Sequence, residues 1–173
     1  MSYLKPDWKW TGLLALLLAG CGATQAGSSA GDSSADGSKY LLSAEPPAAQ
    51  HVKALLESAQ DGDEVTVVGR IGGEQNPWID GLAAFRIADL SLTPCNAIEG
   101  DNCPVPWDYC CEPDLPANRT LVKIVDEGGN VVADGAKQLL NVEELQTVVV
   151  QGKARRDDNG NVSVLATGVY VRE

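Results

Sequence analysis

The sequence predicts a mainly β domain, a closed five-stranded Greek-key barrel with an N-terminal helix and a short helix between the third and fourth strands. Five segments have the apolar patterns and lengths of β-strands. Apolar residues make up 44% of the 173-residue chain, which is enough for a single core. The order of the elements, three strands followed by a helix and two strands, is typical of small closed barrels.

The first 20 residues have the pattern of a signal peptide. Lys5 and Lys9 precede an apolar run at 13–19, which is too short to span a bilayer as a helix. The run ends in Leu18-Ala19-Gly20-Cys21, which resembles the lipobox of bacterial lipoproteins. That resemblance implies that residues 1–20 are removed, that Cys21 is lipidated, and that the protein is membrane-anchored in the cell envelope, facing the periplasm or the outer membrane.

Residues 21–45 are predicted to form a flexible tether. They are mostly Gly, Ser, Ala, Asp and Gln, so they cannot bury enough apolar surface to offset the entropy lost on ordering. The domain itself is expected at 46–173. Pro46 and Pro47 are expected to begin a helix, because apolar residues follow at the i, i+3, i+4, i+7 spacing of a helical face. These residues are Val52, Leu55, Leu56 and Ala59.

The predicted strands and the second helix follow in order. The strands are expected at 65–71, 82–90, 120–126, 147–155 and 162–171, and the helix at 136–145. Gly69 fits a first strand that bends strongly to close a small barrel. The last two strands are expected to form a hairpin, because the Asn-Gly pair at 159–160 favours a tight turn.

The first two strands resemble those of a known superfamily. The pattern Val65, Val67, Gly69, Arg70 and Ile71, followed after a loop by Gly81, Phe85, Ile87 and Asp89, resembles the tRNA/helicase-type OB-fold nucleic-acid-binding superfamily. The resemblance extends over 65–171 and implies an OB barrel. An immunoglobulin-like sandwich is disfavoured, because it would need about seven strands and the sequence has five predicted strands. A different open β-barrel is a further alternative.

A loop at 91–118 contains the cysteines Cys95, Cys103, Cys110 and Cys111. Their even number in an oxidising compartment favours two disulfide bonds. Adjacent cysteines can be joined only in a strained geometry, so Cys95 is expected to pair with Cys110 or Cys111, and Cys103 with the other.

The alternative for these four cysteines is a thiolate site for Zn or Cu. Acidic residues around them would raise the pKa values of the thiols, and a bound cation could offset this effect. A redox enzyme is disfavoured because the loop contains no Cys-x-x-Cys and no neighbouring cation. Under the disulfide interpretation no cofactor is expected.

Cationic and aromatic residues on the strands and loops form a candidate binding surface. They are Arg70, Trp78, Arg86, Trp107, Tyr109, Lys153 and Arg155. OB barrels bind single strands through basic grooves and stacked aromatic rings, and some bind oligosaccharides. The net charge of −11 disfavours nucleic acid as the partner, because phosphate backbones would be repelled.

These observations predict an exported, lipid-anchored OB-fold binding module with a disulfide-stapled loop. Its partner is expected to be a cell-envelope protein or a glycan. A thiolate metal-binding protein and a nucleic-acid-binding OB fold are the alternatives. No enzymatic activity is expected, because the single histidine, His51, lies far in sequence from any nucleophile that could complete a catalytic set. No feature of the sequence indicates an oligomeric state.

Overall fold

The computed structural model describes residues 35–172, so the predicted signal peptide, Cys21 and the tether up to residue 34 lie outside the described residues. The strands are β1 (Gln50–His51), β2 (Glu64–Ile71), β3 (Ala84–Ala88), β4 (Arg119–Ile124), β5 (Thr147–Arg156) and β6 (Val162–Val171). The helices are α1 (Val52–Ser58) and α2 (Ala136–Leu140). Within residues 35–172, no helix is both long and apolar enough to cross a membrane.

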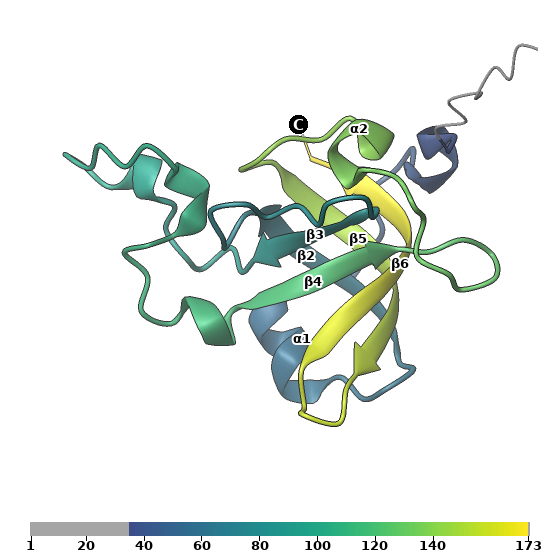
Figure 1. The fold of residues 1–173 in the computed structure, drawn as a ribbon. Coiled ribbons are helices and arrows are strands. Elements are labelled where there is room, and N and C mark those ends of the chain that lie inside the picture. The colour runs from purple at the N-terminus through teal and green to yellow at the C-terminus, as the bar shows by residue number, and fades with distance from the viewer. Residues whose placement is uncertain (1–34, 173) are drawn as a thin grey trace, which may run out of the picture. The chain divides into compact units, whose positions relative to one another are not determined.

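Strands β2 to β6 form a closed barrel (Figure 1). Neighbouring strands follow the order β2-β3-β4-β6-β5, and β2 pairs with β5 to close the circle. All of these pairs are antiparallel except β4 with β6, which is parallel. This closed, mixed, five-stranded barrel is OB-like, so the predicted fold class is confirmed.

Two glycines allow the strands to approach and bend. A Cβ atom on Gly69 would lie 3.0 Å from both the Ala88 carbonyl oxygen and the Ile87 side chain, where β2 crosses from β5 to β3. Gly152 lies at a register shift in the β5–β6 pair, and a Cβ there would overlap the Leu165 carbonyl oxygen. Bulges of this kind bend a strand and increase its twist, which a small barrel requires for closure.

Alternate residues of each strand fill the barrel. Phe85 and Ile87 of β3 and Val122 and Ile124 of β4 are fully buried. Helix α1 covers one end of the barrel with Val52 and Leu55, both fully buried, as its apolar spacing predicts. The helix therefore belongs to the main core.

The helix boundaries differ from the predicted ones. Helix α1 begins at Val52 rather than at Pro46 or Pro47, and the short strand β1, which pairs with β2, precedes it. Helix α2 ends at Leu140 rather than at 145, because Asn141 adopts a left-handed conformation with φ of 50° and ends the helix.

The packed body of the domain begins before residue 46. Tyr40 is 5% exposed and packs in the main core, and Leu41 forms a β-bridge with Val169. Glu45 forms an ion pair with Arg172, with Arg172 Nη2 2.6 Å from Glu45 Oε1. The predicted tether, 21–45, therefore includes residues that pack on the barrel. The short apolar cluster at 40–42 does not by itself indicate that it docks on the last strand.

Candidate functional site

The cysteine-containing loop joins β3 to β4 and extends away from the barrel (teal to green, Figure 1). Three short 3-10 turns give it shape, at Cys95–Ala97, Pro106–Asp108 and Leu115–Ala117. The first two of these turns pack against each other. The loop thereby brings together cysteines that are up to 16 positions apart in the sequence.

Tyr109 is the centre of a second, smaller core beneath this loop. Its side chain is fully buried and packs with Ala88, Leu92 and Leu115. Arg70 Nη1 donates a hydrogen bond of 3.4 Å to the Tyr109 hydroxyl. Burial raises the pKa of Tyr109, and the Arg70 guanidinium offsets part of this increase. The tyrosine therefore fixes the loop to the barrel.

The loop is also attached to the β2–β3 connection. The Trp107 carbonyl accepts a 2.8 Å hydrogen bond from Gly73 N–H, and Trp107 Nε1 donates to the Gln75 carbonyl at 3.1 Å. Gly72 leaves room for this approach, since a Cβ there would lie only 2.6 Å from the Trp107 carbonyl oxygen. Both ends of the Trp107-Asp108-Tyr109 segment are thus held in place.

The sulfur atoms of three cysteines lie around that of Cys110. Cys110 Sγ lies 3.6 Å from Cys95 Sγ, 3.9 Å from Cys103 Sγ and 3.9 Å from Cys111 Sγ. A disulfide bond requires a separation of about 2.05 Å. The predicted gathering of these cysteines is therefore observed, but the sulfurs are near one another and not bonded.

Two aspartates hold the backbone of the cysteines. Asp101 Oδ1 accepts a 2.8 Å hydrogen bond from Cys103 N–H, and Asp108 Oδ1 accepts one of 2.9 Å from Cys110 N–H. Asp108 Oδ1 also lies 3.8 Å from Cys95 Sγ, and Asp101 Oδ2 lies 3.7 Å from Cys111 Sγ. The same carboxylates therefore orient the loop and contact the thiols.

The surroundings of Cys110 and Cys111 raise the pKa values of these two thiols. The pKa of Cys110 is raised well above its ordinary value, first by the contact with Cys95 and then by those with Cys103 and Cys111. For Cys111, the contact with Cys110 lowers the pKa, but burial and the Asp101 carboxylate outweigh it and raise the value. Without a cation, these groups are thiols at neutral pH.

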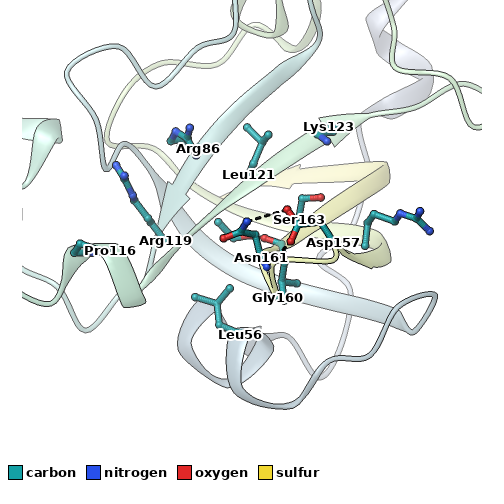
Figure 2. Close-up of a pocket in the computed structure, with 13 residues that line it drawn as sticks. Leu56, Arg86, Pro116, Arg119, Leu121, Lys123, Asp157, Gly160, Asn161 and Ser163 are labelled. Carbon is teal, nitrogen blue, oxygen red and sulfur yellow. Dashed lines mark hydrogen bonds between the residues drawn. The ribbon is translucent and has the colours of Figure 1, made fainter.

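A second candidate site is a groove of about 700 Å³ on the barrel. Its floor is the outer face of β4, where Arg119, Leu121 and Lys123 alternate with buried residues. Leu56 of α1 lines one side and the β5–β6 turn lines another (Figure 2). The polar residues that the turn and the start of β6 contribute are Asp157, Asn161 and Ser163.

Cationic side chains dominate the charge of this groove. Arg86, Arg119, Lys123 and Arg155 line it, against the single carboxylate of Asp157. Arg86 Nε and Arg119 Nη1 share Glu74, at 2.7 and 3.0 Å from its oxygens. The first of these contacts is an ion pair without a hydrogen bond, since Arg86 Nε has no hydrogen-bond partner.

The remaining charges of the groove are paired differently. Arg155 pairs with Asp61, at 2.9 Å, and both are largely exposed. Lys123 has no ion pair among residues 35–172. The Asp157 carboxylate accepts hydrogen bonds from the side chain and backbone of Asn161, which lower its pKa. It is therefore ionised and committed to its own turn, while Lys123 is available to a ligand.

The predicted binding surface is not one surface. Only Arg86 and Arg155 of its seven members line the groove. Trp78 is half-buried against Phe85 and donates a 2.6 Å hydrogen bond to Glu144, so it has a packing role. Lys153 pairs with Glu64 elsewhere on the barrel.

The inclusion of Tyr109 in a binding surface is wrong, because this side chain is fully buried. Arg70 contacts Tyr109, and Trp107 fixes the loop to the β2–β3 connection. These residues support the fold around the cysteines, and no local pattern in the sequence indicates which partners they contact.

Sequence reasoning missed Arg119, Lys123, Asn161 and Ser163 as members of the groove. The signal for the first two was present, since Arg119, Leu121 and Lys123 occupy alternate positions of β4 and share its less buried face. Their neighbours across the groove belong to the β5–β6 turn, which the closure of the barrel brings close.

Comparison with known proteins finds no matching family model and no matching curated protein.

Proposed function

We propose that this protein is a lipid-anchored, non-enzymatic binding module of the bacterial cell envelope whose barrel groove binds an acidic glycan. The observation that supports this function is a groove lined by four cationic side chains, three of them paired with Glu74 or Asp61, on a chain of net charge −11. Lys123, which has no ion pair within residues 35–172, is the principal contact for a carboxylate or sulfate group. Asn161 and Ser163 supply hydrogen-bonding groups for sugar hydroxyls.

A glycan fits the groove better than a nucleic acid does. Proteins that bind single strands without sequence preference stack bases on aromatic rings. No aromatic side chain lines the groove, and Trp78, Trp107 and Tyr109 have structural partners elsewhere. Resemblance to the nucleic-acid-binding OB superfamily would support a nucleic acid as the partner only by analogy of fold.

A glycan also fits better than a protein partner. Protein interfaces are centred on clustered apolar or aromatic anchors. Among residues 35–172, the exposed large apolar side chains are Leu41, Leu82 and Ile98, which come from three separate segments. None of them lines the groove.

The proposal is tested with the full chain in detergent micelles, by calorimetric titration with an oligogalacturonate and with a neutral oligosaccharide of equal length. Saturable binding of the acidic sugar alone, weakened by salt, is the expected result. Equal binding of both sugars, or tighter binding of a single-stranded oligonucleotide, would overturn the proposal. Mass spectrometry of the N-terminal peptide tests separately whether Cys21 is acylated.

Replacement of Lys123 tests the groove directly. Lys123→Ala removes one exposed charge–charge contact, so we expect a two- to fivefold loss of affinity for the acidic sugar, about 0.5–1 kcal/mol. Lys153→Ala is the matched control, because it removes the same charge outside the groove. An equal loss in both variants would mean that only net charge matters.

A further inference from the structure

We propose that Cys95, Cys103, Cys110 and Cys111 bind one Zn²⁺ ion as a four-thiolate centre. The inference does not rest on glycan binding, since none of these cysteines lines the groove. It rests on the positions of the sulfur atoms, on the groups that hold them there and on the charge around them.

Three of the six distances between the four sulfurs, those from Cys110, match a tetrahedral site. A Zn–S bond is about 2.3 Å long, so two thiolates at corners of a tetrahedron around zinc lie about 3.8 Å apart. Cys110 Sγ lies 3.6, 3.9 and 3.9 Å from the sulfurs of Cys95, Cys103 and Cys111. Each of these distances is within about 0.2 Å of the tetrahedral value, the tolerance expected of a metal site.

The pattern is less like two disulfide bonds. In a disulfide arrangement each sulfur has one close partner at about 2.05 Å. Here Cys110 is almost equally distant from the other three sulfurs, as one corner of a tetrahedron is from the other corners. The ligand atoms of Cys95, Cys103 and Cys110 also lie within 4.8 Å of one another, together with a carboxylate oxygen of Asp108. Cys111 belongs to a second such group, with Cys95 and Asp101, so Cys95 is shared by both groups.

Supporting groups hold the cysteines in this arrangement. The carboxylates of Asp101 and Asp108 each bind the backbone N–H of one cysteine, those of Cys103 and Cys110. Tyr109, which precedes Cys110, adopts a left-handed conformation with φ of 57° and is anchored by its buried ring. A non-glycine residue in this conformation persists only where its surroundings fix it. Outer contacts of this kind orient metal ligands.

The charge around the cysteines favours a cation. No lysine or arginine occurs between Cys95 and Asn118, while Asp101 and Asp108 lie within 4 Å of a sulfur. Thiolates suit both Zn²⁺ and Cu(I), and four of them in a tetrahedron are typical of structural zinc. Asp108 also falls within the group formed by Cys95, Cys103 and Cys110, so it is the competing fourth ligand to Cys111.

Native mass spectrometry and elemental analysis of the full chain, purified without chelator under nitrogen, test the site. We expect one zinc per chain and, apart from Cys21, four thiols that react with Ellman's reagent only after the metal is removed. Titration of the metal-free chain with Co²⁺ should give the charge-transfer absorption of thiolate ligands. A chain without metal and with no reactive thiol other than Cys21, lighter by four hydrogen atoms, contains two disulfides and overturns the inference. One copper in place of zinc overturns the assignment of the metal.

Variants identify the ligands. Cys110→Ser and Cys111→Ser should each weaken Co²⁺ binding by more than about 100-fold, because loss of an outer-shell group alone costs about 10- to 100-fold. Asp108→Asn should cost less than either, and Glu99→Gln, an exposed acid in the same loop, should have no effect. Greater loss in Asp108→Asn than in Cys111→Ser would overturn the four-thiolate set. Far-ultraviolet circular dichroism checks that each variant retains the barrel.

Discussion

Asp89 joins the barrel to helix α1 through a single buried side chain. It is 1% exposed, and its Oδ2 accepts a 2.8 Å hydrogen bond from Lys53 N–H in the first turn of the helix. Its Oδ1 accepts a 2.9 Å hydrogen bond from Ser91 N–H. Burial raises the pKa of Asp89, but the hydrogen bonds from Lys53 and Ser91, with a smaller contribution from His51 Nδ1 at 3.6 Å, outweigh it and hold the pKa below its ordinary value. A residue distant in sequence thus caps the helix.

This geometry predicts a pH-dependent loss of stability. Because the folded pKa is lowered, the contribution of Asp89 is complete above the unfolded pKa of about 3.9 and disappears as the pH falls through the folded pKa. Asp89→Asn should reduce the free energy of unfolding by about 1–3 kcal/mol at pH 7. Urea denaturation should show a smaller difference between the two proteins at pH 3 than at pH 7.

Asp158→Asn provides the control for this comparison. Asp158 is exposed, so this variant should unfold like the wild type at both pH values. A difference between Asp89→Asn and the wild type that does not depend on pH would show that packing, and not the charge of Asp89, carries the effect.

The cysteine loop is an element with its own small core. Tyr109, Ala88 and Leu92 form a cluster separate from the main core of the barrel. Tyr109→Ala should therefore loosen the loop locally, by about 3 kcal/mol or more, because a fully buried aromatic ring is lost. Hydrogen exchange should increase at 95–112 and remain slow in β5 and β6.

Tyr109→Phe separates the ring from its hydroxyl. It removes only the 3.4 Å hydrogen bond to Arg70, so it should leave exchange in the loop close to that of the wild type. Equal loss of protection across the whole barrel in Tyr109→Ala would contradict the separation of the two cores.

The β5–β6 hairpin closes the barrel through its bulge at Gly152. A Cβ at this position would overlap the Leu165 carbonyl oxygen, which belongs to backbone and cannot rotate away. Gly152→Ala should lower the free energy of unfolding by more than about 3 kcal/mol, as measured by urea denaturation. Gln151→Ala, one residue away and half-buried, should change it by less than about 1 kcal/mol. Similar values for both variants would mean that the bulge tolerates a side chain.

At the scale of the whole molecule, closure of the barrel places charges from distant segments together. Arg119 and Lys123 lie on β4, Arg155 lies near the end of β5, and Asp157 and Asn161 lie in the turn before β6. The net charge of −11 describes the chain as a whole and conceals this local cationic surface. The pairing of β4 with β6 creates the groove, and no local pattern encodes that pairing.

Local patterns predicted most of the elements. The predicted bounds of strand β6, 162–171, are those of the structure. The predicted bounds of strands β2 to β5 lie within a few residues of the observed ones, because the apolar pattern of a strand can be recognised along the chain. The early start expected for α1 was wrong, because Pro46 and Pro47 suit a first turn but β1 intervenes before the helix. The docking of Tyr40 depends on a contact with the far end of the chain.

The sequence by itself determined the fold class, the order of the strands and the grouping of the four cysteines in one loop, since each depends on polarity or spacing along the chain. Tertiary structure decided that Tyr109 is a core residue and not a ligand contact, that the sulfurs meet around Cys110, and that the groove lies along β4. These features depend on contacts between separate segments, such as β4 with β6 and the cysteine loop with the β2–β3 connection, and a linear pattern contains no record of such contacts.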